Sequence, residues 1–314
     1  MDSALSFVED TLNGFIWNVV PVFLIFAGVY FGFRTLFVQI RMFPDMLKAV
    51  AETPKGKDKE GRDLDEEYGG LSAFKAFTIS AASRVGTGNI AGVALAISIG
   101  GPGAVFWMWM LALLGGATSF IESTLAQLWK TKDAEGNYHG GPAYYMTRGL
   151  GWKPLAVIFS AFLAITYGFV YNAIQTNSIA ESVSGSLDND STTVKAVVAA
   201  VIALLTAAVI FGGVTRIASW TQVIVPFMAG AYILLGIAVL IINWREIPGM
   251  FELIVGHALG LKQVAGAGVG AAFTQGMRRG LFSNEAGMGS APNAAATATV
   301  SHPVKQGLVQ TLGV

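Results

Sequence analysis

Cysteine is absent from the 314 residues of this sequence, histidine occurs only three times, and charged residues make up only 13% of the chain. The absence of cysteine excludes disulfide bonds, thiol nucleophiles and metal sites built on cysteine. Soluble domains carry about a quarter charged residues, so the low fraction is typical of a protein that lies in a bilayer. Acidic and basic residues balance at a formal net charge of zero, and this balance gives no indication of a nucleic-acid partner.

Long apolar runs take the place of the missing charge, because 53% of the residues are hydrophobic. Seven windows approach or exceed the roughly 20 apolar residues that a helix needs to cross a bilayer. The sequence therefore predicts an all-α polytopic membrane protein that contacts the lipid bilayer and needs no obligatory protein partner. Residues 1–10 contain three acids and no base, which is the wrong start for a signal peptide. The windows cover residues 15–38, 71–99, 104–129, 155–179, 194–211, 217–242 and 264–288.

Lysine and arginine are distributed unevenly between the two ends of these windows. If the N-terminus lies outside, sixteen of them fall on the cytoplasmic side, three fall outside, and Arg84 alone lies within a span. The paired Arg278 and Arg279 are among the sixteen. Because cytoplasmic loops are enriched in lysine and arginine, this bias predicts a multi-pass protein of the plasma (inner) membrane with its N-terminus outside.

The second window is interrupted in its middle by the sequence Gly-Thr-Gly-Asn at residues 86–89. Inside hydrocarbon, each backbone N–H or C=O that a helix break frees costs several kcal/mol unless it finds a partner. In transporters, such breaks point a half-helix N-terminus at an anionic substrate group and offer free carbonyls to a cation. We therefore interpret this interruption as half of a substrate and ion site.

The seventh window carries a second interruption, because residues 274–280 combine Thr-Gln-Gly with paired arginines and do not suit an uninterrupted lipid-facing helix. The two interrupted windows are five spans apart and run in opposite directions. This arrangement predicts an inverted repeat with a substrate site at the membrane midplane. One transmembrane domain, 1–314, would then hold an extra helix (1–38), a first repeat (71–242) and the start of a second (264–314). Because an eighth span would begin where the sequence stops, we expect a truncated chain.

Three ionisable residues at membrane depth are candidates for function, because charge is costly there. Glu122 in the third window is one, and its alternative role is a structural acid that satisfies the opened backbone of a neighbouring broken helix. Arg84 is predicted to pair with Glu122 or Glu285, or to reach water on the inner side, as part of a cytoplasmic gate. The alternative for Arg84 is a guanidinium that extends along the helix to the inner interface.

A polar and aromatic stripe runs along the fourth window. Tyr167, Tyr171 and Gln175 are spaced at i, i+4 and i+8, which places them on one face of a helix. Such a face is predicted to point to the protein interior, with Gln175 as a ligand for substrate. Hydrogen bonding between helices is the alternative role of Gln175.

Three motifs carry a resemblance to a known family: Ser-Arg-Val-Gly-Thr-Gly-Asn-Ile-Ala-Gly at 83–92, Gly-Gly-Pro-Ala-Tyr-Tyr-Met at 140–146, and Gly-Leu-Phe-Ser-Asn-Glu-Ala-Gly at 280–287. With these motifs the chain resembles the alanine or glycine:cation symporter family, sodium-coupled amino-acid carriers with a LeuT-type fold. The resemblance covers essentially the whole chain. It implies symport of a small neutral amino acid with Na⁺ by alternating access, with H⁺ as an open alternative.

The same resemblance implies roles for individual residues. Backbone amides at the first break would hold the substrate carboxylate, and residues from the fourth and seventh windows would surround its amino group and side chain. Carbonyls before the break would bind sodium, and the remaining sodium ligands would come from a later helix that the sequence lacks. The implied substrate residues are Gly86, Thr87, Gly88, Asn89, Gln175, Phe273, Thr274 and Met277, and the implied sodium residues are Ala82 and Val85.

Two other classes of function compete with a transporter. A channel, which we keep as the alternative, needs rings of carbonyls or like charges, and nothing in this sequence repeats to supply them. An intramembrane enzyme needs a nucleophile with a base, or metal ligands, at membrane depth. All three histidines fall in loops or at the ends of spans and cysteine is absent, so we predict no enzymatic activity.

Overall fold

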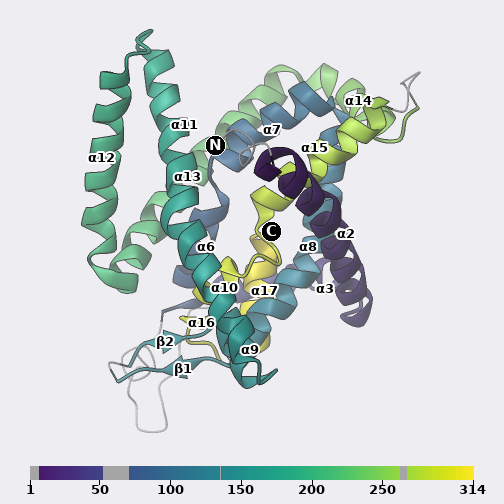
Figure 1. The fold of residues 1–314 in the computed structure, drawn as a ribbon. Coiled ribbons are helices and arrows are strands. Elements are labelled where there is room, and N and C mark those ends of the chain that lie inside the picture. The colour runs from purple at the N-terminus through teal and green to yellow at the C-terminus, as the bar shows by residue number, and fades with distance from the viewer. Residues whose placement is uncertain (1–6, 52–70, 135, 262–266) are drawn as a thin grey trace.

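The computed structural model describes residues 7–51, 71–134, 136–261 and 267–314, and helices dominate this part of the chain (Figure 1). The one sheet among these residues is a hairpin of two short antiparallel strands. In chain order the elements are η1 (Phe7–Leu12), α2 (Asn13–Arg34), α3 (Val38–Arg41), α4 (Phe43–Ala51), α6 (Ala73–Arg84), α7 (Thr87–Gly100), α8 (Gly103–Leu128), β1 (Thr131–Lys132), β2 (Tyr138–His139), α9 (Pro142–Arg148), α10 (Lys153–Ile165), η2 (Thr166–Val170), α11 (Tyr171–Ser186), α12 (Thr192–Ile210), α13 (Gly213–Ile242), η3 (Trp244–Glu246), α14 (Ile247–Ala258), α15 (Ala267–Asn284), α16 (Ser290–Ala296) and α17 (Pro303–Leu312).

Five helical segments are long and apolar enough to cross a membrane, and they coincide with five of the seven predicted windows. They make the chain a multi-pass membrane protein. The other two windows contain shorter helices, so a total of seven spans stays a prediction. The five segments are α2, α8, Lys153–Ser186 (which joins α10, η2 and α11), α12 and α13.

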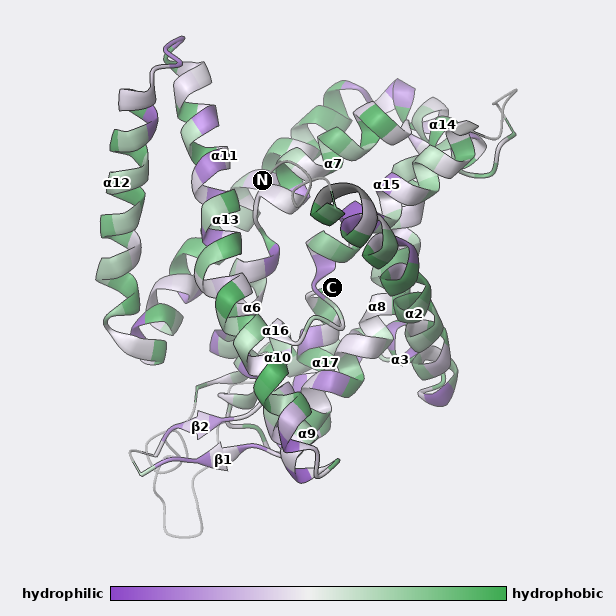
Figure 2. Ribbon diagram, viewed as in Figure 1, coloured by the Kyte–Doolittle hydropathy of each residue, from purple (hydrophilic) through white to green (hydrophobic). Residues whose placement is uncertain are grey.

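The apolar helices differ in how much protein surrounds them. Helix α8 is central, because it packs against α2, α14, α15, α16 and α17. By contrast, α11 and α12 form an antiparallel pair at one side of the molecule (Figure 1), and no residue in the apolar window of α12 is buried. Hydrophobic residues cover α12 and α13 on most sides (Figure 2). Such composition and exposure are typical of membrane-spanning helices.

The second window is broken where the sequence predicts. Helix α6 ends at Arg84 and α7 begins at Thr87, which leaves Val85 and Gly86 outside both helices. Gly86 occupies the N-cap position of α7 in an extended conformation and has no side chain to accept a hydrogen bond. The first amides of α7 therefore need acceptors from elsewhere in the chain.

The seventh window is interrupted at a different place from the predicted one. Helix α15 continues without a break through residues 274–280, so the prediction of an interruption there is wrong. The chain leaves the helix only at residues 285–289, before α16 starts. Glu285, Gly287 and Gly289 have φ angles of 52°, 82° and 83°, in the left-handed region. This conformation ends a helix, so residues 285–289 form the second break.

Close packing explains why the helix tolerates the polar and glycine-rich residues 274–280. A Cβ atom on Gly276 would lie 2.5 Å from the carbonyl oxygen of Ala104 in α8. Small residues allow such close approach between membrane helices. The guanidinium of Arg278 lies 5.6 Å from the ring centre of Trp17, which is a cation–π contact. The glycines in this stretch therefore mark a packing face, not a gap in the helix.

The position of α15 also changes the predicted charge distribution. Arg278 and Arg279 lie within this helix, and the side chain of Arg279 approaches Gly92 of α7. Both arginines therefore belong to a helix, whereas the count of basic residues placed them on the cytoplasmic side. Fourteen basic residues against three remain without them, so the predicted orientation does not depend on this pair.

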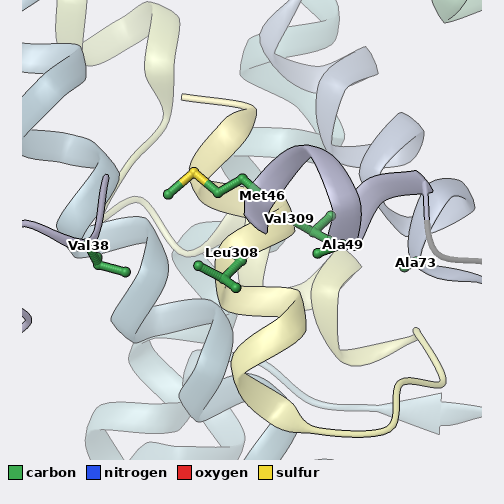
Figure 3. Close-up of a cluster of buried hydrophobic side chains, with 6 residues drawn as sticks. All are labelled: Val38, Met46, Ala49, Ala73, Leu308 and Val309. Atoms are coloured by element: carbon green, nitrogen blue, oxygen red, sulfur yellow. The ribbon is translucent and has the colours of Figure 1, made fainter. Parts of the chain in front are cut away.

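The two broken helices are joined where α6 begins and α16 ends. Leu71 forms a parallel bridge with Ala298; its N–H donates to Thr297 O at 3.0 Å, and its carbonyl accepts from Thr299 N–H at 2.8 Å. The Gln127 side chain at the end of α8 donates to the carbonyls of Ala295 and Ala298. Nearby, side chains from α3, α4, α6 and α17 form a buried cluster (Figure 3). The cluster consists of Val38, Met46, Ala49, Ala73, Leu308 and Val309.

Candidate functional site

A cavity of about 260 Å³ lies beside the first break and reaches the second. Its walls come from the C-terminal end of α6, from η2 and α11, and from the start of the second break. It is the place where the two interrupted windows and the predicted polar stripe meet. The lining residues are Ala82, Ser83, Val85, Gly86, Tyr167, Tyr171, Asn172, Gln175 and Glu285.

Gln175 supplies a hydrogen-bond acceptor on the α7 side of the first break. Its Oε1 accepts a hydrogen bond from Thr87 N–H at 3.3 Å, so a neutral oxygen occupies the N-terminus of α7, where the sequence predicts the substrate carboxylate. A Cβ atom on Gly86 would lie 2.6 Å from Gln175 Nε2. Gly86 is therefore required for the approach of this side chain to the backbone. The structure brings Gly86, Thr87 and Gln175 together as predicted.

Asn89 satisfies the opposite side of the same break. Its Nδ2 donates to the carbonyl oxygen of Arg84 at 2.8 Å, while its own N–H donates to Gly86 O at 3.1 Å. Asn89 thus replaces a helical hydrogen bond that the break removes. Gly88 has a packing role, because a Cβ atom there would lie 2.8 Å from the ring of Phe282.

The aromatic stripe of the fourth window lines the cavity, as predicted. The Tyr167 and Tyr171 rings are 4.8 Å apart, and Tyr171 stacks on Phe282 at 5.3 Å. The stripe starts in a π-helical turn, η2, and such turns occur frequently at functional sites. The Tyr167 hydroxyl is buried beside Glu285 and Ser290.

Glu285 connects the two breaks. Its two carboxylate oxygens accept from Ser83 Oγ at 2.7 and 2.8 Å, and its Oε2 accepts from Ser290 Oγ at 2.6 Å. Only 3% of Glu285 is exposed. Because Ser83 belongs to α6 and Ser290 begins α16, one carboxylate fastens both broken helices to the cavity. Neither serine was predicted to belong to the site, although Ser83 opens the motif at 83–92 and Ser290 follows the motif at 280–287.

Glu122 has its alternative predicted role, that of a structural acid that satisfies the opened backbone of a neighbouring broken helix. Its Oε1 accepts from the N–H of Gly287 at 3.2 Å. Gly287 lies in the second break, so the buried carboxylate supplies an acceptor to backbone that no helix satisfies. Glu122 does not line the cavity.

Arg84 has partners that the sequence did not predict. Its Nη1 donates to the carbonyl oxygen of Gln310 at 3.0 Å, and its Nη2 donates to Ser119 Oγ at 3.4 Å. No ion pair joins it to Glu122 or Glu285 in the part of the chain that the structure describes, and only 4% of it is exposed. The predictions of a direct ion pair and of a side chain that reaches the inner interface are therefore wrong for this structure. The carbonyl at the C-terminal end of α17 is an alternative partner for a buried guanidinium.

Six of the eight predicted substrate residues do not line the cavity: Thr87, Gly88 and Asn89 at the start of α7, and three residues of α15. The Phe273 ring packs edge-on against Trp107 with centres 4.9 Å apart. Met277 is buried against Leu111 of α8. Thr274 is exposed on α15. All three precede the second break, whereas the sequence placed the interruption among them, so their predicted contact with substrate stays a prediction.

A larger cavity of about 640 Å³ adjoins the first and shares Ser83 and Tyr167 with it. Its walls include Tyr138 and His139 of the hairpin, which the predicted orientation places on the cytoplasmic side. Ser290 also lines it. Ser83 and Tyr167 therefore lie between the cavity of about 260 Å³ and the wider cavity of about 640 Å³.

The whole chain matches a known protein family. The model of the sodium:alanine symporter family matches residues 1–314. The chain belongs to this family. The resemblance inferred from the three motifs is thereby confirmed.

Several relatives in the sodium:alanine symporter family match almost the whole chain. It is 51% identical over its full length to "Amino-acid carrier protein AlsT" of Bacillus subtilis (strain 168), covering 64% of that relative. It is 44% identical over its full length to "Probable sodium/glutamine symporter GlnT" of the same strain, covering 63%. Over 97% of the chain it is 40% identical to "Sodium/alanine symporter AgcS" of Methanococcus maripaludis, covering 66%. The chain thus spans 63% to 66% of the length of these relatives, which are named as carriers and symporters, not enzymes.

Proposed function

We propose that this chain forms the substrate-binding part of a secondary active transporter. The transporter moves a small neutral amino acid, alanine or glycine, together with Na⁺ across the plasma (inner) membrane by alternating access. The observation that carries this proposal is the cavity at the first break, because Gln175, which lines it, accepts a hydrogen bond from Thr87 N–H at the start of α7. Membership of the sodium:alanine symporter family supports the same function.

The geometry suggests how an amino acid would enter. Its carboxylate would replace Gln175 Oε1 at Thr87 N–H, because the helix N-terminus favours a negative charge. The released Gln175 oxygen could then accept from the substrate ammonium group. The exchange keeps Thr87 N–H and Gln175 Oε1 paired, since the hydrogen bond between them is replaced by one from each to the substrate.

Sodium would bind at carbonyls released by the break. Ala82 and Val85 line the cavity, and a cation there would offset the charge of the substrate carboxylate. Each ligand would then strengthen the binding of the other, which is the coupling free energy of symport. The proposal includes a LeuT-type fold in which residues 71–242 and 264–314 belong to inverted repeats and the N-terminus lies outside.

Exchange across liposomes tests this function. The full-length transporter that contains this chain would be reconstituted into liposomes loaded with unlabelled alanine, and external radiolabelled alanine would be added in sodium chloride, in choline chloride and with an imposed proton gradient. We expect saturable counterflow that requires sodium. Flux that does not saturate, or that depends only on the proton gradient, would contradict sodium-coupled symport.

A further inference from the structure

Three ionisable side chains are buried in the centre of the molecule. Arg84, Glu122 and Glu285 lie around the breaks, and Arg84 interacts electrostatically with both acids. Arg84 Nη1 is bonded to a carbonyl of α17 and Glu122 to a backbone amide of the second break. Of the three, Glu285 is bonded to hydroxyl groups alone among the hydrogen bonds of the described residues.

Glu285 is the carboxylate that can accept a cation. Both of its partners, Ser83 and Ser290, are neutral hydroxyls. An ionised carboxylate offers about four acceptor positions, and these hydroxyls do not fill them all. Glu285 lines the cavity, whereas Glu122 does not. The free acceptor capacity of the buried centre is therefore concentrated at Glu285.

Further oxygen atoms surround this carboxylate. A serine hydroxyl that donates to Glu285 keeps its lone pairs for a cation. The Tyr167 hydroxyl lies beside Glu285 and Ser290, and Tyr167 lines the same cavity as Glu285. Carboxylate and hydroxyl oxygens suit a hard cation, and they also suit an ammonium group, which has three donors and no acceptor.

We infer that Glu285, with the hydroxyls of Ser83 and Ser290, forms the anionic wall of a binding site for a monovalent cation. The cation is either the coupling sodium ion or the ammonium group of the bound amino acid. This inference rests on the proposed function and assigns its cation to a side chain instead of to backbone carbonyls alone. Because the two serines belong to α6 and α16, the occupied site would hold both broken helices together.

Equilibrium binding to Glu285→Gln tests the site, with Glu122→Gln as the matched control. Radiolabelled alanine binding to the full-length transporter that contains this chain would be measured across a sodium titration at constant ionic strength, together with direct binding of ²²Na⁺. If sodium occupies the site, Glu285→Gln raises the sodium concentration for half-maximal alanine binding by about tenfold or more. If the ammonium group occupies it, alanine affinity falls by about tenfold at saturating sodium while ²²Na⁺ binding is unchanged.

The control and a second variant keep the test decisive. Glu122→Gln retains an oxygen for Gly287 N–H, so both affinities are expected to stay within about threefold of the wild type. Ser290→Ala keeps the charge and removes one hydroxyl, and it is expected to weaken the same step as Glu285→Gln. Unchanged binding in folded Glu285→Gln, or in folded Ser290→Ala if Glu285→Gln does not fold, overturns this inference alone. A wild-type chain that binds neither alanine nor sodium contradicts the proposed function itself.

Discussion

The two breaks solve the same backbone problem with different chemistry. The first break leaves Val85 and Gly86 outside the helices and is closed by the neutral amides of Gln175 and Asn89. The second spans residues 285–289, has three left-handed residues and is held by the carboxylate of Glu122. Gln175 lines the cavity, so a ligand there can take its place as acceptor, whereas Glu122 lies outside the cavity. Thr87 N–H of the first break is therefore suited to exchange its acceptor, and Gly287 N–H of the second to keep its acceptor.

The largest expected effect is the loss of the fixed support. Glu122→Ala leaves Gly287 N–H without its buried acceptor and creates a cavity, so we expect a stability loss of about 3 kcal/mol. Thermal unfolding in detergent measures this loss, and Glu122→Gln, which keeps an acceptor, should recover most of it. Equal stability of the alanine variant and the wild type would show that the carboxylate does not support the second break.

Closing the approach at the first break should affect binding more than stability. A side chain in Gly86→Val would lie where Gln175 contacts the backbone, since a Cβ atom there is 2.6 Å from Nε2. We expect alanine affinity to fall by about tenfold, which corresponds to roughly 1.4 kcal/mol. Gly230→Ala is the control, because nothing lies within 4 Å of a Cβ atom at that position. Similar affinities for both variants would contradict the role of Gly86.

Removing the displaceable acceptor should have a comparable effect. Gln175→Leu leaves Thr87 N–H unpaired, and we expect it to weaken amino-acid binding by about 1–3 kcal/mol. Binding and thermal unfolding would be measured on the same preparation. If stability falls while the folded fraction binds alanine normally, Gln175 only connects helices and the exchange of acceptors is wrong.

The smallest effect concerns pH at the junction of the broken helices. Lys130 Nζ donates to Ala298 O at 2.6 Å, and burial lowers the pKa of Lys130 from 10.5 to about 8. The unfolded chain therefore keeps this proton at higher pH than the folded one, and Lys130 adds stability as pH rises from about 8 to 10.5. Partial exposure to solvent limits the gain to about 1 kcal/mol or less.

Unfolding of the wild type and of Lys130→Met at pH 7.5 and at pH 10 checks this prediction, with both pH values chosen to flank about 8, the pKa of Lys130. The stability of the wild type relative to the variant should increase at the higher pH. A decrease would mean that the charged form of Lys130 is stabilised by the fold and not destabilised by burial.

The sequence predicted the first break more closely than the second, for a physical reason. Two glycines inside an apolar window signal a helix end directly, and α6 and α7 separate at that point. In the seventh window the glycines 276 and 280 instead permit close packing on α8. The real break begins at Glu285, and side-chain type alone does not reveal a left-handed backbone at this residue.

The site shows the same division between local and long-range information. Spacing along one helix placed Tyr167, Tyr171 and Gln175 on one face, and all three line the cavity. The contacts of Arg84 with Gln310, and of Glu285 with Ser83, join residues that are more than 200 positions apart. No local pattern encodes such pairs, so the acids and the arginine could be recognised as important but not matched to their partners.

Mutual dependence of alanine and sodium binding tests the central claim most directly. Calorimetric titration would give alanine affinity at low and at saturating sodium, and sodium affinity with and without alanine. If both ligands bind at the breaks of one site, the two affinities change by the same factor, as linkage requires, and Gly86→Val reduces alanine affinity at both sodium concentrations. Alanine affinity that is independent of sodium in the wild-type chain would contradict the claim that the breaks form one coupled site.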